Sequence, residues 1–180
     1  ASAVPTYCCA RLARQDGKTL LLAGDGGDEI FGGNARYAKQ KIFEWYGMLP
    51  SGMRRGLVEP ILFSGSWVQS IPPLRKAMSY AQQARTPLPD RLEAYNFLER
   101  EVLGDIFEPD FLAAVDPHEP RTIARDVYAR TTSRSPVNRM MHLDLKKILA
   151  DNDLRKVNGM CEAAGIEVRY PLLDDELVVF

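Results

Sequence analysis

Apolar and polar positions follow two different periods along the chain, and these predict two kinds of structure. Apolar residues recur at helical spacing over 7–13 and Asp16 and Gly17 follow, so we predict a first helix that ends there. An apolar run predicts a strand at 19–23, and strict alternation predicts a short extended segment at 166–170. A helix that leads into a strand is typical of an α/β fold.

From Asn34 to the region of residue 130 the pattern is helical. Turn-forming residues interrupt it at 50–52, 64–66, 72–73, 87–89 and 116–117. We interpret these stretches as short breaks within one helical array.

A further helix is predicted by apolar residues that share one face over about four turns. These residues are Val137, Met141, Leu145, Ile148 and Leu149. We interpret that face as core packing. The polar run at 151–153 predicts a cap before another helix at 154–164, which Gly165 ends.

The composition is that of an ordinary soluble domain. A chain of 180 residues with 46% hydrophobic and 26% charged residues can bury one core, so we treat residues 1–180 as one domain. Its 23 basic and 24 acidic residues give a formal charge of −1, so no overall field favours nucleic acid. No apolar run approaches the about 18 residues that span a bilayer, and we expect no membrane association.

Cysteine usage indicates a reducing compartment. Three cysteines, Cys8, Cys9 and Cys161, are an odd number, and the adjacent pair cannot readily form a disulfide. We therefore expect reduced thiols in a cytoplasmic protein. Cys8 and Cys9 lie in the predicted first helix, where a buried structural role is typical of cysteine.

The glycine-rich turn, residues 24–33, is the strongest candidate for a site. It would place Asp25, Asp28 and Glu29 between the end of the strand and the start of a helix, the edge at which open α/β sheets bind ligands. Two consecutive glycines, Gly32 and Gly33, weaken a helix and indicate close packing or ligand approach. The alternative is structural, because glycines also serve tight turns and first-turn carboxylates stabilise the helix dipole.

The residue types of this turn imply a cation. Backbone N–H groups at glycines and at a helix start attract phosphate, whereas the three carboxylates repel it. A magnesium ion that bridges the protein to a nucleotide phosphate would reconcile the two. The turn is not the loop of nucleoside triphosphatases, because no Gly-Lys-Ser/Thr follows it. It is not the dinucleotide-binding fingerprint either, because Glu29 occupies the place of the third glycine.

Two blocks of the chain resemble the synthetase domain of glutamine-hydrolysing asparagine synthetases. Residues 23–33, Ala-Gly-Asp-Gly-Gly-Asp-Glu-Ile-Phe-Gly-Gly, are similar to the family's Ser-Gly-(Asp/Glu)-Gly-x-Asp-Glu-x-Phe-Gly-Gly. Residues 154–160 and 165–174 resemble its Lys-Val-Asp-Arg-Met and Gly-Leu-Glu-x-Arg-x-Pro-Phe-Leu-Asp. The opening residues 2–7 also look like the family's segment before the strand. The helical middle carries no clear signature.

The resemblance implies a nucleotide-binding, ATP pyrophosphatase-type parallel-sheet domain, of which this mostly helical chain is the C-terminal part. Such a domain adenylates aspartate with ATP and Mg²⁺ and lets ammonia derived from glutamine attack the activated carboxylate. By the match, Ala23 and Gly24 lie against the nucleotide through their backbone. Asp25 takes the place of the catalytic acidic residue needed to form the aspartyl-adenylate, and Asp28 helps to hold magnesium and pyrophosphate. A homodimer of the full-length protein is left open.

The chain departs from the family pattern in three respects. Ala23 replaces the first serine of the signature, and Gly159 replaces an arginine. Lys156 or Arg155 could supply the missing positive charge, but a helix turns about 100° per residue, so neither points in the same direction as residue 159. The amidotransferase domain and the Ser-Gly-Gly-x-Asp-Ser pyrophosphate loop are absent from residues 1–180. We therefore expect these residues by themselves not to turn over ATP.

Two other functions remain open at this point. A related adenylating enzyme that forms a different amide, such as a β-lactam-forming or peptide-modifying synthetase, would share the glycine-rich turn. A non-catalytic helical interaction module would explain the helical middle but not the two blocks. For Glu167 and Arg169, an ion pair with neighbouring helices is the structural alternative to substrate contact.

Overall fold

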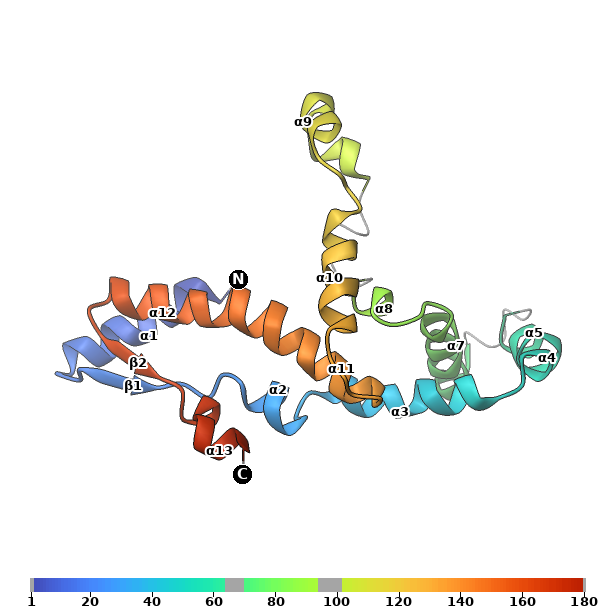
Figure 1. The fold of residues 1–180 in the computed structure, drawn as a ribbon, viewed down its shortest axis with the longest axis horizontal. Helices are drawn as coiled ribbons and strands as arrows, with labels where there is room; N and C mark the ends of the chain where they lie inside the picture. Colours follow the sequence, from blue (N-terminus) through green and yellow to red (C-terminus); the bar gives the residue numbers. More distant parts are fainter. Residues whose placement is uncertain (1, 64–69, 94–101, 180) are drawn as a thin grey trace. The chain divides into compact units, whose positions relative to one another are not determined.

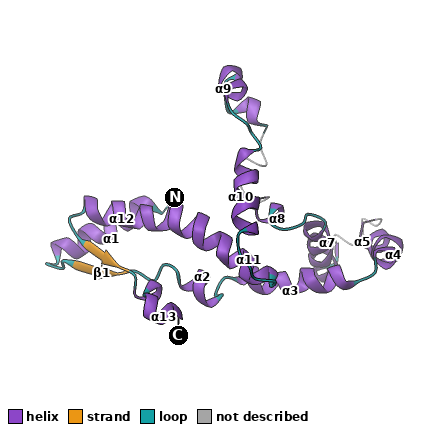
Figure 2. Ribbon diagram, viewed as in Figure 1, coloured by secondary structure: helices purple, strands orange, loops and turns teal. Residues whose placement is uncertain are grey.

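The computed structural model describes residues 2–63, 70–93 and 102–179, which divide into two compact units. Unit 1 combines Ala1–Asn34 with Thr131–Phe180, and unit 2 is Ala35–Arg130. Helices dominate the described residues of both units, and the strands lie in unit 1 (Figure 1, Figure 2). The assignment of residues 1–180 to one domain stays a prediction.

Unit 1 contains a two-stranded parallel sheet and its surrounding helices. Its elements are α1 (Ala3–Gln15), β1 (Leu20–Leu22), α2 (Gly27–Phe31), α11 (Pro136–Leu143), the π-helical segment η4 (Asp144–Asp153), α12 (Leu154–Ala163), β2 (Glu167–Arg169), the 3₁₀ turn η5 (Pro171–Leu173) and α13 (Asp175–Val179). The predictions of a first helix, of a strand at 19–23 and of an extended segment at 166–170 are confirmed.

The two strands pair with each other in parallel, with Leu21 opposite Val168 at the centre of the register. One hydrogen bond extends the ladder at each end: the N–H of Glu167 donates to the carbonyl of Thr19, and the N–H of Ala23 donates to the carbonyl of Arg169, both at 2.9 Å. Because the strands are parallel, the segments that follow them leave the sheet at the same edge. The glycine-rich turn and η5 therefore meet.

Helices α1 and α12 pack together and cover one face of this sheet (Figure 1). The core of unit 1 is a cluster of four buried residues, Ala10, Val157, Cys161 and Ile166. Leu21 and Val168 point into this cluster from the strands, because successive strand side chains alternate between faces. Leu20 and Leu22 consequently face away from α1 and α12 and are exposed among the described residues.

The expectation that Cys8 and Cys9 are buried is wrong, because both side chains are exposed on α1. The buried face of this helix runs through Ala10 and Ala13, which contact the core cluster, and neither cysteine lies on it. Cys161 is buried, and burial raises the pKa of its thiol. All three cysteines are free thiols, in agreement with the sequence expectation.

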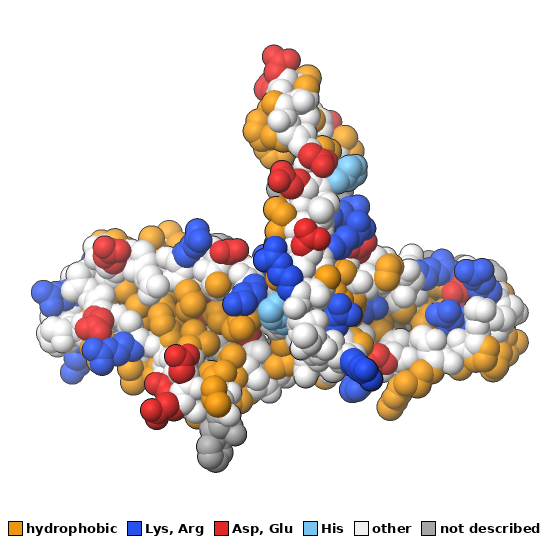
Figure 3. All heavy atoms as spheres, in the orientation of Figure 1, with side chains coloured by type: hydrophobic (Ala, Val, Ile, Leu, Met, Phe, Trp, Pro, Cys, Tyr) orange, Lys and Arg blue, Asp and Glu red, His pale blue; other side chains and the backbone are white. Residues whose placement is uncertain are grey.

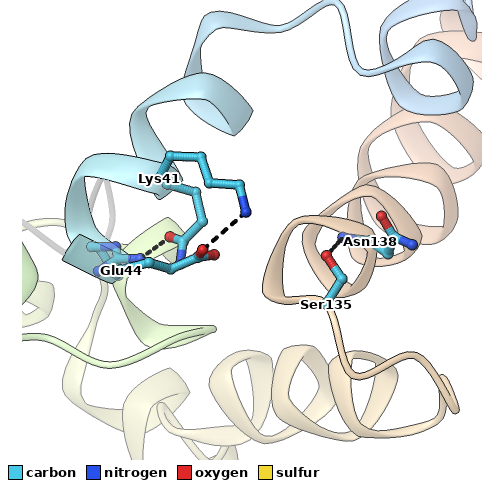
Figure 4. Close-up of polar contacts among 6 residues, drawn as sticks. Lys41, Glu44, Ser135 and Asn138 are labelled. Atoms are coloured by element: carbon cyan, nitrogen blue, oxygen red, sulfur yellow. Dashed lines mark hydrogen bonds and ion pairs between the residues drawn. The ribbon is translucent and has the colours of Figure 1, made fainter. Parts of the chain in front are cut away.

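Helices α11 and α12 are joined without a break through η4, so the predicted cap at 151–153 is wrong. Asp153 has helical backbone angles, φ −71° and ψ −47°, and its side chain makes no capping hydrogen bond. The real cap is at the start of α11, where the Ser135 hydroxyl accepts a hydrogen bond from the N–H of Asn138 at 3.4 Å (Figure 4).

The predicted core face of this helix is only partly correct. Leu149 is buried as expected, but Val137, Met141, Leu145 and Ile148 are half-buried. The buried positions are instead Met140, Leu143, Asp144 and Leu149. A π-helical segment has more residues per turn than an α-helix, so a face extrapolated at 3.6 residues per turn drifts away from the buried one.

Unit 2 is helical throughout its described residues. Its elements are α3 (Ala35–Met48), α4 (Ser51–Met53), the π-helical turn η1 (Arg54–Val58), α5 (Glu59–Phe63), α7 (Pro72–Ala84), α8 (Asp90–Glu93), the 3₁₀ turn η3 (Leu103–Asp105), α9 (Pro109–Ala114) and α10 (Glu119–Ala129). The breaks predicted at 50–52, 87–89 and 116–117 coincide with helix boundaries. Pro72 and Pro73 begin α7 rather than interrupt a helix, and 64–66 lies outside the described residues.

Aromatic and charged side chains together stabilise the packing of unit 2. Phe43 on α3 meets Tyr80 on α7 edge to face, with ring centroids 5.8 Å apart. The buried Arg91 stacks on Phe43 at 4.0 Å and donates a hydrogen bond to the amide oxygen of Gln40. On the exposed side of α3, Lys41 forms an ion pair with Glu44 at 3.2 Å (Figure 4).

Acidic and basic side chains are interspersed over the visible faces of both units (Figure 3), in agreement with the formal charge of −1. None of the described helices is both long enough and apolar enough to cross a bilayer.

We predict that an ion pair between α8 and α10 makes the stability of unit 2 depend on pH. Arg125 donates two hydrogen bonds to the Asp90 carboxylate, at 2.8 and 2.6 Å. Hydrogen bonding to Arg125 lowers the pKa of Asp90 below its ordinary value of about 3.9. Between the two pKa values, Asp90 is therefore charged in the folded state and protonated in the unfolded state. The ion pair stabilises the fold fully at pH values above the unfolded pKa of Asp90, and this stabilisation is lost as the pH falls through the lower folded pKa.

Thermal unfolding of Asp90→Asn is expected to begin at a lower temperature than that of the unmodified chain at pH 7, and this difference should shrink as the pH is lowered towards 2. Asp126→Asn, on an exposed face of α10, is the control and should leave the unfolding temperature unchanged at both pH values. An equal effect of Asp90→Asn at both pH values would contradict the ion-pair explanation.

Candidate active site

The glycine-rich turn leaves the carboxyl end of β1 and folds directly into α2. Gly26, with φ 92°, precedes the first residue of this helix, and Gly32, with φ 72°, follows the last. Both angles lie in the left-handed region, which glycine adopts without steric cost. The pair Gly32 and Gly33 therefore ends α2. The expectation that these glycines lie inside a helix is wrong.

Crowding of the turn is confirmed, and side chains of the protein itself produce it. A Cβ atom on Gly26 would collide with the side chain of Leu173, and one on Gly27 would lie 2.8 Å from Cδ1 of Leu172. Both leucines belong to η5. The turn therefore fits against the segment that follows the second strand only because it has no side chains at these two positions.

Gly33 is crowded from within the turn. A Cβ atom there would lie 2.5 Å from Oδ1 of Asp28, so the carboxylate of Asp28 folds back over Gly33. Gly24 has the opposite environment, since a Cβ atom on it would meet nothing within 4 Å. Packing accounts for Gly26, Gly27 and Gly33, but it does not account for Gly24.

A cavity of about 400 Å³, which we call the turn pocket, lies beside the glycine-rich turn. Its carboxylates come from Asp25, Asp28, Glu29 and Asp153, and its apolar wall comes from Leu149 and Leu172. The cavity is of the size that small-molecule sites occupy, about 300–1,000 Å³. Four acidic side chains around one cavity favour a cation or a ligand that brings one.

The turn pocket unites three of the four residues that the sequence nominated. Gly24, Asp25 and Asp28 line it. Ala23 does not, because its N–H group is bonded to Arg169 and its side chain packs against the core cluster of unit 1. Asp25 is half-buried and Asp28 is exposed.

The carboxylates of the turn pocket suit a magnesium ion that keeps water and phosphate ligands better than a metal ion held by protein side chains alone. Among the described residues, no three His, Cys, Asp or Glu side chains come close enough together to bind a metal ion. Magnesium commonly takes only one or two protein carboxylates and completes its shell with water and substrate phosphates. Asp28, exposed at the mouth of the pocket, provides a ligand of that kind.

Lys156 does not itself line the turn pocket, but it forms an ion pair with a residue that does. Its amino group lies 2.6 Å from the carboxylate of Asp153, which lines the cavity. Arg155 pairs instead with Asp151 at 3.5 Å on an exposed part of the helix, and neither of these residues lines the cavity. Gly159 has open space around it, since a Cβ atom there would meet nothing within 4 Å.

Tyr170 is hydrogen-bonded to helix α12, and the charge of Asp25 acts on its pKa. Its hydroxyl donates a hydrogen bond to the amide oxygen of Asn158 at 2.9 Å. Burial raises the pKa of Tyr170, and the negative charge of Asp25 raises it further. The tyrosine therefore stays neutral beside Asp25 and keeps its proton for Asn158.

Glu167 and Arg169 form an ion pair with each other, with 2.7 Å between Nε of Arg169 and Oε1 of Glu167. The structural alternative considered from the sequence, an ion pair with neighbouring helices, is therefore wrong for this pair. They are separated by one residue on a strand, which places both side chains on the same face of the sheet. Both side chains are largely exposed, so the pair contributes little stability.

Sequence reasoning did not include Asp153, Leu149 or Leu172 in the site. Asp153 was expected to cap a helix, and Leu149 was expected in the core. Leu172 could have been found, because parallel pairing of the two predicted strands would bring the residues after each strand to one edge. The π-helical geometry that turns Asp153 towards the pocket has no comparable signal in the sequence.

Comparisons with known proteins agree on one family. The family model described as asparagine synthase matches residues 1–180. A Bacillus subtilis (strain 168) protein named asparagine synthetase (glutamine-hydrolyzing) 1 is 25% identical over 174 residues, which are 96% of this chain and 26% of the relative. A Mycobacterium tuberculosis (strain H37Rv) protein, provisionally given the same enzyme name, is 30% identical over 179 residues, which are 97% of this chain and 25% of the relative.

The chain thus spans about a quarter of the length of the curated relatives that it matches. No solved structure matches it significantly.

We predict that three glycine-to-alanine substitutions separate backbone strain from crowding. Gly24→Ala should change the free energy of unfolding by less than about 0.5 kcal/mol, because its surroundings are open. Gly17→Ala, at φ 75° with nothing nearby, should cost about 1–2 kcal/mol. Gly26→Ala should cost about 2–5 kcal/mol, since the collision with Leu173 adds to the strain.

Urea denaturation measures the three changes. In a double-mutant cycle with Leu173→Ala, the cost of Gly26→Ala should fall towards that of Gly17→Ala, because only the steric part is removed. Equal costs at positions 17 and 26 would show that Leu173 does not constrain the turn.

Proposed function

The chain belongs to the asparagine synthase family, and we propose from this membership that it helps to activate aspartate with ATP for asparagine synthesis. In this proposal the chain forms the C-terminal part of a synthetase domain that accepts ammonia derived from glutamine. Free thiols at all three cysteines are compatible with a cytoplasmic protein. The amidotransferase and the pyrophosphate loop would be supplied by other parts of the polypeptide, and a homodimer remains open.

The observation that carries the proposal is the contrast between Gly24 and its neighbours in the turn pocket. Close protein contacts require glycine at positions 26, 27 and 33, whereas the space beside Gly24 is empty and opens into a cavity of about 400 Å³. A glycine that packing does not require, at the carboxyl end of a parallel strand, allows a ligand to approach the backbone. We assign the nucleotide to this space, with contacts to the backbone of Ala23 and Gly24.

Asp28 is proposed to hold Mg²⁺ together with the phosphates of ATP. It is exposed at the pocket, and its carboxylate lies over Gly33 and does not pair with a basic side chain in the described structure. When bound, the metal ion would neutralise the charge of the departing pyrophosphate. It would also offset the repulsion between the pocket carboxylates and the nucleotide.

Asp25 is proposed as the catalytic residue. It is half-buried in the turn pocket, and its charge acts on Tyr170, which is fixed in turn by Asn158. A half-buried carboxylate next to the accessible backbone of Gly24 can orient the amino group or a bound cation of the substrate during attack on the α-phosphate. Such displacements depend mostly on positioning and electrostatics.

Lys156 is proposed to replace the positive charge that the family carries at the position of Gly159. It is half-buried and already bound to Asp153 at the pocket, whereas Arg155 is exposed and paired elsewhere. Rotation of the lysine away from Asp153 would bring an ammonium group to the phosphates. The open space at Gly159 also permits the arginine of the family to be restored.

A related adenylating synthetase with another acceptor is the second candidate, and Gly159 is the observation that favours it. Loss of a cation beside the reacting groups would suit a carboxylate substrate of different charge. Pyrophosphate release with aspartate and with other carboxylates separates the two candidates. The family match includes the helical middle, so we do not propose a stand-alone helical module.

We predict that Asp28→Asn and Asp25→Asn have different effects. Asp28→Asn should weaken magnesium-dependent binding of ATP by about tenfold, equivalent to about 1.4 kcal/mol, because a charged metal ligand is lost. Asp25→Asn should leave this binding within about twofold and lower pyrophosphate release by at least about a hundredfold. Calorimetry on the chain measures binding, and turnover is followed in a polypeptide that joins the chain to the family's pyrophosphate loop.

Asp16→Asn is the matched control, because Asp16 is an exposed carboxylate at the end of α1 and does not line the pocket. Unchanged binding in Asp28→Asn, or unchanged pyrophosphate release in Asp25→Asn, would overturn the corresponding role.

A further inference from the structure

Unit 2 contains a second polar cavity, which we call the arginine pocket. It measures about 390 Å³ and is lined by Tyr46, Arg54, Arg55, Glu59, Ala84 and Arg85. These residues come from the end of α3, from η1 and α5, and from the end of α7, all of which belong to unit 2 (Figure 1). Nothing in the proposed synthetase chemistry uses this cavity.

The charge of the arginine pocket is unbalanced. Within the described part of the chain, three arginines line it, and Glu59 is the one carboxylate that does. Like charges that converge on a cavity repel one another and are normally relieved by solvent, by acidic neighbours or by a bound anion. The lining therefore selects for a ligand that carries about two negative charges.

Two of the arginines already contact side chains of the protein before any ligand binds. Arg85 is bonded to Glu59 at 2.6 Å and lies over the ring of Phe63, with its guanidinium carbon 4.5 Å from the centroid. Arg54 lies 5.6 Å from the centroid of the Tyr46 ring. Such preorganisation lowers the entropic cost of binding, because the side chains are already ordered.

Glu59 and Tyr46 support this arrangement and do not compete for a cation. The Tyr46 hydroxyl donates a hydrogen bond to Glu59 at 3.0 Å. The hydrogen bonds from Arg85 and Tyr46 lower the pKa of Glu59, whereas burial and Glu59 raise the pKa of Tyr46. At neutral pH the pair therefore remains one carboxylate and one neutral phenol, and the carboxylate is occupied by Arg85.

Arg55 is the arginine left to bind a ligand. It is exposed and makes no hydrogen bond or ion pair with any residue in the described part of the chain. It follows Arg54 in the π-helical turn η1, and single π-helical turns are frequent at functional sites. The turn brings two consecutive arginines to one cavity.

We propose that the arginine pocket binds the phosphoryl group of a small phosphate monoester. Guanidinium groups match the oxygen geometry of a phosphoryl dianion with paired hydrogen bonds. Such a group carries about −1.5 to −2 charges at pH 7, which equals the excess positive charge of the lining. A cavity of about 390 Å³ leaves room for an organic substituent besides the phosphoryl group.

The test is calorimetric titration of the chain with three probes: glycerol 3-phosphate, inorganic phosphate and succinate. Magnesium is omitted, so the acidic turn pocket repels all three anions and a failure of the proposed synthetase function does not affect the result. Glycerol 3-phosphate should bind with a dissociation constant of about 1 mM or tighter, at least as well as inorganic phosphate. Succinate should bind more weakly than either.

Arg55→Gln should weaken binding of glycerol 3-phosphate at least about fivefold, and Arg54→Gln/Arg55→Gln should abolish saturable binding. Arg75→Gln, the same change at an exposed position of α7 outside the pocket, should leave binding unchanged. Since Arg55 is exposed, its substitution should not alter thermal unfolding, which serves as the folding control.

Three results would overturn the proposal. They are absence of saturable binding to the unmodified chain, equal affinity in the Arg55→Gln and Arg75→Gln variants, and tighter binding of succinate than of the phosphate monoester. Binding of inorganic phosphate without binding of the monoester would overturn the assigned ligand class.

Discussion

Parallel pairing of β1 with β2 is the constraint on which the rest of unit 1 depends. It joins Leu20–Leu22 to Glu167–Arg169, two segments at opposite ends of the chain, and turns their apolar sides towards α1 and α12. Because the strands run in the same direction, the glycine-rich turn and η5 emerge at one edge. An antiparallel pair would place them at opposite ends, and the turn pocket would not form.

The chemistry of the site follows from close packing at that edge. Leu172 and Leu173 occupy the space that side chains at Gly27 and Gly26 would need, so the turn approaches η5 closely and its carboxylates face the cavity. The same crowding stops short of Gly24, where the backbone is accessible. Close packing requires glycine at positions 26 and 27 of this short sequence, whereas the open space at Gly24 is explained by the proposed nucleotide contact.

Local patterns predicted the elements around the site, because their signals lie within a few residues. The leucine run, the alternation before Pro171 and the change from apolar strand to glycine and carboxylate each identify one local structure. The departures have longer-range causes. The π-helical segment moved the buried face of the long helix and brought Asp153 to the pocket, and the exposure of Cys8 and Cys9 depends on which side of α1 meets α12.

The central claim is that magnesium and ATP bind where the glycine-rich turn meets η5. Hydrogen–deuterium exchange of the chain, with ATP alone and with ATP and magnesium together, tests it most directly. The account predicts slower exchange over residues 20–33 and 167–173 only when both are present, with residues 72–84 of unit 2 unaffected. Equal protection without magnesium, or protection confined to unit 2, would contradict it.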